Sequence, residues 1–328
     1  MRDVALPDGE AGVTPARIVD GVRAWVASPP LRDLVARFGG DGPPGDPLSG
    51  DLAAALAWLD DFSARHWDFR GGRERPEAAE PAFDPRTAGL VLAAASALGL
   101  VRSVPPARPA YAYLVVLGGL AHACLRRVAY AAHLVGSGTA VAGEVAVLGS
   151  FRPLSGAERR VLADAGVTAG DTEVDALDAA VRLTFGVAGS AEEDGVDAGH
   201  PHRSWSSRTW RPAGLPPVRV LAAPSGEPGR RRAHTADTQR FWAGHVRLSP
   251  GDPVLMVTAP IYVPFQHCDA LRTLAVPYGC GIETVGVDPA LPDLARLPEP
   301  ALTPGRYLQE IRSAIRSMRA LHSALPPG

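Results

Sequence analysis

The sequence contains no lysine and no asparagine, and isoleucine is scarce. All 33 basic side chains counted as lysine or arginine are therefore arginines. This pattern is typical of the codon bias of a GC-rich genome. The abundance of arginine is thus no evidence for a binding site, and an arginine becomes informative only through its position.

Cysteine is also rare, and the only three residues are Cys124, Cys268 and Cys280. Their spacing fits neither a metal-ligand motif nor a disulfide framework, so we expect no metal site. Few and unpaired cysteines are typical of a reducing compartment, which favours a cytoplasmic protein. The start of the chain, MRDVALPDGE, lacks the basic and then apolar layout of a signal peptide.

Long hydrophobic runs are missing. The longest lie near Ala88–Val101 and Ala112–Leu125, which is too short to span a bilayer, so we expect no membrane association. The formal net charge is −2. A nucleic-acid-binding surface needs an excess of basic charge to displace counterions, so we expect no nucleic-acid partner.

The first part of the chain, residues 1–102, has the periodicity of helices. Ile18, Val22 and Trp25 recur at helical spacing after a start signal at Thr14-Pro15. Similar patterns follow at Leu52–Leu59 and Leu90–Leu100. We expect a helical N-terminal region, which is also the surface where we expect any oligomerisation or partner contact.

The second part, residues 110–328, alternates apolar strands with helical patterns. The predicted strands are YAYLVVLGG (111–119), EVAVLGS (144–150), VRVLAAP (218–224), PVLMVTAP (253–260) and GIETVGVD (281–288). Continuous apolar strands between helices predict an α/β fold, with a mostly parallel sheet of about five strands and helices on both faces. The irregular segment at about 188–217 is predicted to be an insertion or a lid.

Ligands of an open parallel sheet bind outside the carboxyl ends of its strands. The residues just after the predicted strands are rich in glycine, hydroxyl groups and arginine, which suits an anionic ligand better than a metal. These candidate ligand-binding residues are Gly118, Gly119, Gly149, Ser150, Arg152, Ser225 and Thr258. For Gly118-Gly119 a tight turn is an equal alternative, and Arg152 is equally well explained as a surface residue. Ser155 and Glu158 form a capping-box pattern, which favours a structural role for Glu158.

The clearest candidate site is the stretch APSGEPGRRRAHTADTQRFWAG, residues 223–244. Arg231 and Arg232 stand just before a helix predicted to begin at His234-Thr235. A helix N-terminus offers unpaired N–H groups and a partial positive charge, so these arginines and Thr235 are predicted to bind an anion. Asp237 and Glu227 are the predicted acid–base residues if a proton is transferred. The alternative is a solvated loop, at least for one arginine.

The order of these motifs resembles the YdcF/SanA/ElyC-like family over about residues 110–321. The strand ending in VVLGG is followed by a helix with Arg126 and Arg127, and HTAD (234–237) resembles the family's later helix start. After VTAP, Tyr262 and Phe265 or Gln266 stand where the family has His and Arg. The resemblance implies a Rossmann-like sheet, a ligand site that includes Arg126 and Tyr262, and a nucleotide-like or phosphate-bearing ligand. S-adenosylmethionine binding is implied by one branch of the family.

Two functions fit these observations. One is an enzyme of bacterial specialised metabolism that acts on an anionic, nucleotide-like or phosphate-bearing small molecule. The other is a non-catalytic protein that binds a small molecule, S-adenosylmethionine among them, or a partner. A methyltransferase is disfavoured because Arg152 stands near the position where an acidic adenosine-binding residue is required.

Overall fold

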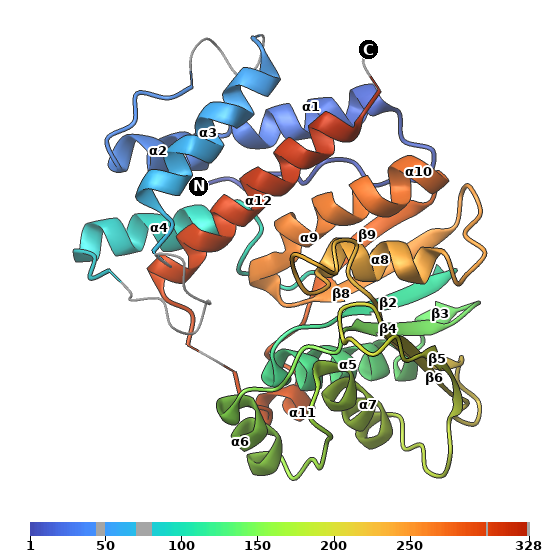
Figure 1. The fold of residues 1–328 in the computed structure, drawn as a ribbon. Coiled ribbons are helices and arrows are strands. Elements are labelled where there is room, and N and C mark those ends of the chain that lie inside the picture. Colours follow the sequence, from blue (N-terminus) through green and yellow to red (C-terminus); the bar gives the residue numbers. More distant parts are fainter. Residues whose placement is uncertain (44–49, 70–80, 300, 327–328) are drawn as a thin grey trace.

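The computed structural model describes residues 1–43, 50–69, 81–299 and 301–326. Four helices come first, followed by an α/β unit and a long C-terminal helix (Figure 1). The helices are α1 (Pro15–Val26), α2 (Pro29–Arg37), α3 (Leu52–His66), α4 (Pro85–Ala97), α5 (Ala121–Gly136), α6 (Gly156–Asp164), α7 (Glu173–Thr184), α8 (Thr235–Ala243), α9 (Val263–Ala270), α10 (Val276–Tyr278), α11 (Pro292–Ala295) and α12 (Pro304–Ala324), with a 3-10 turn η2 (Pro260–Tyr262) and a π-helical turn η3 (Leu271–Ala275).

A seven-stranded mixed sheet forms the centre of the α/β unit. Its order is β5-β6-β7-β4-β2-β8-β9, and a separate two-stranded parallel sheet joins β1 to β3. The strands are β1 (Ala110–Tyr111), β2 (Tyr113–Leu117), β3 (Ala140–Val141), β4 (Val145–Gly149), β5 (Glu192–Val196), β6 (Trp205–Trp210), β7 (Val218–Ala222), β8 (Pro253–Thr258) and β9 (Gly281–Gly286). Strands β7, β4, β2, β8 and β9 run parallel, whereas β5 and β6 pair in the antiparallel sense.

Both faces of the parallel strands are buried. Alternate side chains of a strand point to opposite faces, so Leu114 and Val116 of β2 join one hydrophobic cluster and Val115 and Leu117 join the other. The first cluster includes apolar residues of α5 and α7, and the second includes those of α9 and α12. Figure 1 shows these two helix layers on opposite sides of the sheet.

The N-terminal helices share the second of these clusters. Trp25 of α1 and Trp67 after α3 are fully buried and belong to the same cluster as Met256 of β8. Helix α12 lies between α9 and the N-terminal helices and contributes Leu308, Ile311 and Ile315. The helical region and the sheet are thus joined by a continuous core, and their division into two domains stays a prediction, as does oligomerisation through the helices.

The α/β class and the helical N-terminal region are confirmed. The expected sheet of about five mostly parallel strands has two strands more than predicted, because the antiparallel strands β5 and β6 extend the five parallel ones. The irregular insertion expected at 188–217 contains these two strands, so it is not irregular throughout. All five residues of β5 are exposed, and its sequence EEDGV lacks apolar alternation, so no strand signal was visible. Charged residues on an edge strand protect it from pairing with other chains.

Among the described residues, no helix combines the length and the apolar character that spanning a membrane requires.

Helix α12 should carry much of the stability of the fold. We expect Ile315→Ala to lower the free energy of unfolding by about 2–5 kcal/mol, because it removes a fully buried side chain from the shared cluster. Arg316 on the same helix has a side chain that is 58% exposed, and Arg316→Ala should change stability by less than about 1 kcal/mol. Urea denaturation of both variants measures the difference. If both substitutions lowered the free energy of unfolding equally, the role of the buried face of α12 in the shared core would be contradicted.

Candidate functional site

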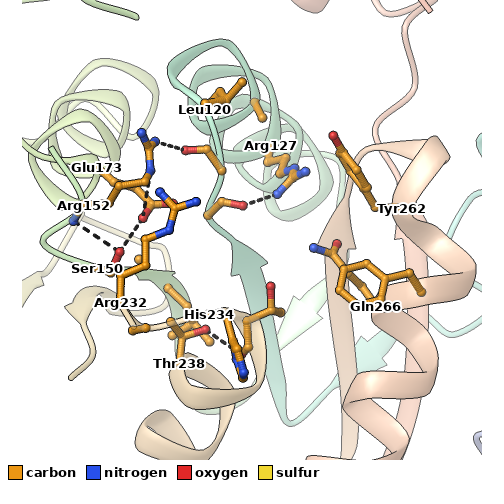
Figure 2. Close-up of a pocket in the computed structure, with 18 of the residues that line it drawn as sticks. Leu120, Arg127, Ser150, Arg152, Glu173, Arg232, His234, Thr238, Tyr262 and Gln266 are labelled. Carbon is orange, nitrogen blue, oxygen red and sulfur yellow. Dashed lines mark hydrogen bonds and ion pairs between the residues drawn. The ribbon is translucent and has the colours of Figure 1, made fainter. Parts of the chain in front are cut away.

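A cavity of about 310 Å³ opens at the carboxyl ends of β2 and β4. Its walls come from the residues after these two strands, the starts of α5, α7 and α8, and the segment from η2 into α9 (Figure 2). Figure 2 shows Ser150, Arg152, Glu173 and Arg232 on one side of the hollow and Tyr262 and Gln266 on the other. The cavity therefore lies at the edge of the sheet where parallel strands place their ligands.

Four arginines from four parts of the chain line this cavity. Arg127 belongs to α5, Arg152 follows β4, Arg232 precedes α8, and Arg306 belongs to α12. Glu173 is the one carboxylate among the described lining residues. The cavity thus brings together more positive than negative charge.

Glu158 holds Arg152 in place on one side of the cavity. Arg152 Nη1 and Nη2 donate to the two carboxylate oxygens of Glu158 at 2.9 and 2.8 Å, and Nη2 also donates to the Gly119 carbonyl at 2.8 Å. Glu158 also accepts the backbone N–H of Ala121, the first residue of α5, at 3.1 Å. The capping box with Ser155 is confirmed. Burial opposes the ionisation of Glu158, but hydrogen bonds from Arg152 and Ser155 outweigh it and lower its pKa to about 2.

Glu173 is the first residue of α7 and is 8% exposed. Ser150 Oγ donates to its Oε2 at 2.8 Å, and Arg152 Nε lies 3.9 Å from the same oxygen. Burial raises the pKa of Glu173, although the charges of Arg152 and Arg232 and the Ser150 hydrogen bond act in the opposite direction. The backbone at Gly118 passes so close that an added Cβ would lie 2.6 Å from Glu173 Oε1, so only glycine fits there.

Arg127 is 2% exposed and is held by the end of β2. Its Nη1 donates to the Leu117 carbonyl at 2.7 Å and also to the Gly118 carbonyl. Its guanidinium carbon lies 5.5 Å from the centre of the Tyr262 ring, within cation–π range. A fixed positive charge therefore stands between the two sides of the cavity.

His122 lies in the first turn of α5 and lines the cavity. Burial and the neighbouring Arg127 lower its pKa to about 4. The imidazole is therefore neutral at neutral pH and adds no charge to the arginines.

The structure brings together eight of the predicted site residues. They line the cavity and are Gly118, Gly119, Gly149, Ser150, Arg152, Arg232, Thr235 and Tyr262. Six others do not belong to the lining: Arg126, Ser225, Glu227, Arg231, Asp237 and Thr258. Both predicted acid–base residues are thus outside it.

The three arginines of the 230–232 turn separate into different environments. Arg230 has a side chain that is 84% exposed and lies 3.6 Å from Glu227, whereas Arg232 is also exposed but lines the cavity. Arg231 binds Asp237, with Nη2 3.2 Å from Oδ1, and its Nε lies 3.1 Å from Glu227 Oε1. Asp237 also accepts the His234 N–H at 3.0 Å and so caps α8. Burial is the largest single influence and opposes its ionisation, but the hydrogen bonds and charges of Arg231 and His234 together outweigh it and lower the pKa of Asp237. The carboxylate is engaged within the fold.

The remaining predicted residues also serve the fold. Arg126 donates to the carbonyls of Leu294 and Leu297 at 2.8 and 3.1 Å, which fastens α5 to α11. Thr258 is fully buried at the end of β8. Ser225 Oγ accepts the N–H of Glu227 at 3.0 Å, as expected of a turn.

The cavity is also lined by His122, Glu173, Thr238 and Arg306, which the sequence did not indicate as ligands, and by Arg127, Phe265 and Gln266, which were named only within the resemblance. Glu173 could have been considered from the sequence, because it opens α7, the second helix after the strand at 144–150. Arg306 could not, because the long helix α12 brings it from near the end of the chain to the cavity.

Fold and cavity together define an α/β protein with an arginine-lined cavity at the carboxyl edge of its sheet. Comparison with known proteins then places the chain in the family of Rv3785. The family model described as "Rv3785 N-terminal domain" matches residues 9–99. The uncharacterized proteins Rv3785 of Mycobacterium tuberculosis and Mb3814 of Mycobacterium bovis are each 33% identical to it, over 99% of this chain and 94% of theirs. No solved structure matches the chain.

The resemblance to the YdcF/SanA/ElyC-like family is therefore wrong. The matches point to the Rv3785 family instead, and its model covers the N-terminal helices that the resemblance left unexplained. The motifs VVLGG and HTAD reflect general physics: a buried strand, a tight glycine turn and a capped helix start recur in many α/β proteins. The expectation of S-adenosylmethionine or nucleotide binding loses its basis with this correction.

Glu158 should make the stability of the protein depend on pH. Because its pKa in the folded state is about 2 and its ordinary value is 4.5, it stabilises the fold above pH 4.5, and this contribution is lost as the pH falls towards 2. We expect Glu158→Gln to cost about 3 kcal/mol at pH 7 and progressively less below pH 4.5. Urea denaturation across this pH range measures the effect.

Glu192→Gln is the matched control, because the Glu192 side chain is 66% exposed beside Arg211, and it should change stability little. If the loss of unfolding free energy caused by Glu158→Gln stayed the same down to pH 2.5, the ionised carboxylate would not be its cause.

Proposed function

We propose that the protein binds an anionic small molecule in the cavity at the ends of β2 and β4. The observation that carries this proposal is the convergence of Arg127, Arg152, Arg232 and Arg306 on one site. Within the described lining these four guanidinium groups accompany one carboxylate, Glu173, while Glu158 binds Arg152 from outside the lining. Arg127 is buried and Arg152 and Arg306 are partly buried, whereas Arg232 is exposed. Like charges held close together repel one another, and an anion between them lowers this cost.

The chemistry of the walls favours oxyanions such as phosphate or carboxylate. Guanidinium groups present N–H donors in a planar fork that matches such ligands. Helix α5 also begins at the cavity, where the Glu158 carboxylate already accepts its first N–H from Ala121 and offsets part of the positive charge of this helix end. Ser150 and Thr235 add hydroxyl groups to the lining.

The order of the strands supports the same position for the site. In chain order, the five parallel strands stand as third, second, first, fourth and fifth across the sheet. We infer a Rossmann-like parallel core to which β5 and β6 were added. In such cores the ligand lies where the chain reverses its direction of progress, which is beside β2.

The three neighbouring arginines of the 230–232 turn give a matched test. We expect Arg232→Ala to weaken the binding of sulfate and inorganic phosphate at least tenfold, because it removes a charge from the cavity mouth. Arg230→Ala removes the same charge from an exposed side chain and should leave affinity unchanged. Isothermal titration calorimetry measures both.

Arg231→Ala should lower thermal stability and leave affinity unchanged, because Asp237, with a side chain only 4% exposed, loses its ion-pair partner. Equal weakening of binding in all three variants would show only a general effect of net charge and would contradict the site.

A second candidate function, an enzyme that transfers a proton to or from the bound anion, is favoured by the contact of Ser150 with Glu173. A buried carboxyl group with a raised pKa inside a ligand site is a recurring acid–base arrangement. In this candidate Glu173 takes the role that the sequence analysis gave to Asp237 and Glu227.

Glu173 should couple anion binding to pH. Its ionised form repels an anion, so affinity for sulfate, whose own charge is constant, should rise as the pH falls through the raised pKa of Glu173. We expect Glu173→Gln to bind sulfate more tightly than the wild type at a pH where Glu173 is ionised, and the affinity of this variant should not rise as the pH falls. Titration from pH 8 to pH 5 stays above the pKa of His122, which is about 4. A wild-type affinity that does not depend on pH would contradict this role.

A further inference from the structure

Two aromatic side chains line the cavity on the side that faces Arg152 and Arg232. In residues 261–270, all of which the structure describes, Tyr262 and Phe265 are partly exposed and the other eight residues are buried. Both aromatic residues belong to the lining, and Figure 2 shows Tyr262 across the hollow from the two arginines. Residues three apart in a helical turn point to the same side. The exposed surface of this buried segment is therefore a pair of neighbouring aromatic rings at the cavity.

The segment that carries these rings is fixed by its neighbours. Ser317 Oγ of α12 donates to the Phe265 carbonyl at 2.9 Å, and His267 Nε2 on α9 lies 2.9 Å from the Pro7 carbonyl oxygen. The Arg127 guanidinium carbon lies 5.5 Å from the centre of the Tyr262 ring. Side chains that are already held in place lose little conformational freedom when a ligand binds. The two rings thus form a prepared surface.

The cavity is larger than a simple oxyanion. Its volume is about 310 Å³. A water molecule takes up about 30 Å³ of the liquid, and a tetrahedral oxyanion only a few times as much. An anion bound by Arg152 and Arg232 therefore leaves room on the side of Tyr262 (Figure 2). A ligand that fills the cavity needs a second part beyond its anionic group.

The lining favours an apolar ring as this second part. Covering apolar surface contributes about 25 cal/mol per Å², and aromatic rings gain further from stacked or edge-on contacts with another ring. Leu120, Ala123 and His122 also line the cavity and bring no charge, because the His122 imidazole is neutral at neutral pH. The cavity thus has charged groups for one end of a ligand and ring surfaces for the other.

We propose that the ligand is an organic anion with an apolar ring, whose anionic group lies at Arg152 and Arg232 and whose ring packs against Phe265 and Tyr262. This inference rests on the proposed function and deepens it by naming the class of ligand. The arginines attract the anionic group, and the two aromatic residues distinguish an anion that carries a ring from a small inorganic one.

The test compares methanesulfonate with benzenesulfonate by titration calorimetry. Both are anions of strong acids and carry one negative charge at any pH near neutral, so they differ only in the group on sulfur. We expect the wild type to bind benzenesulfonate at least ten times more tightly than methanesulfonate. In Phe265→Ala this advantage should fall below threefold, whereas the affinity for methanesulfonate changes less than twofold. Arg232→Ala should weaken the binding of both sulfonates by a similar factor.

Phe241→Ala is the matched control. Phe241 on α8 is also a partly exposed aromatic residue, but it does not belong to the described lining, and its ring centre lies 5.5 Å from that of Trp205. This substitution should leave both affinities unchanged.

A second measurement needs no variant and serves if Phe265→Ala fails to fold. Crystals of the wild type are soaked with 4-bromobenzenesulfonate, and the anomalous signal of bromine locates the ring. We expect the bromine peak within about 4.5 Å of the Phe265 or Tyr262 ring, which is the range of an apolar contact.

The outcomes separate the two proposals. The ring site is overturned and the anion site stands if benzenesulfonate binds no more tightly than methanesulfonate, if Phe265→Ala keeps the advantage, or if the bromine peak lies away from both rings. Binding of benzenesulfonate that Arg232→Ala leaves unchanged also overturns this inference. If sulfate and both sulfonates fail to bind the wild type, the proposed function is overturned together with it.

Discussion

The carboxylate of Glu158 joins the segments that form one side of the cavity, and the position of Arg152 depends on it. It binds the guanidinium of Arg152, the first N–H of α5 and the cap of α6, so three segments that follow β2 and β4 are fixed by one side chain. A charge-assisted hydrogen bond is stronger in a buried position than in water. Removing one partner leaves the other charge buried and unpaired, which strongly destabilises the fold. The hydrogen bonds of Glu158 therefore fix the position of Arg152 beside the cavity.

Three further arginines line the cavity beside Arg152. Arg127 is fixed by the carbonyls at the end of β2, and Arg232 and Arg306 reach the site from segments distant in the chain. Glu173 sits among them with a raised pKa because burial disfavours its charge. Among the described lining residues, the cavity thus combines positive groups, of which Arg127 and Arg152 are held by hydrogen bonds, with one buried carboxyl group of raised pKa.

The sequence predicted the strands whose apolar runs are continuous, and it predicted that the site lies at their carboxyl ends. It could not predict β5, since an exposed edge strand such as EEDGV has no apolar period. The arginine turn shows the same limit for the site. Arg230, Arg231 and Arg232 are three identical neighbours in the sequence. In the fold, Arg230 is exposed, Arg231 pairs with Asp237, and Arg232 lines the cavity. Short motifs also misled the assignment of the family, because strand ends and helix caps obey the same physics in unrelated proteins.

The most direct test of the central claim is a crystal structure of the protein soaked with selenate, with data collected at the selenium absorption edge. Selenate has the charge and the tetrahedral shape of sulfate, and its anomalous signal reports its position without ambiguity. We expect an anomalous peak within hydrogen-bond distance of Arg152 and Arg232, and we expect this peak to be absent in Arg232→Ala. A cavity without a peak, while selenate occupies other surface sites, would contradict the anion site.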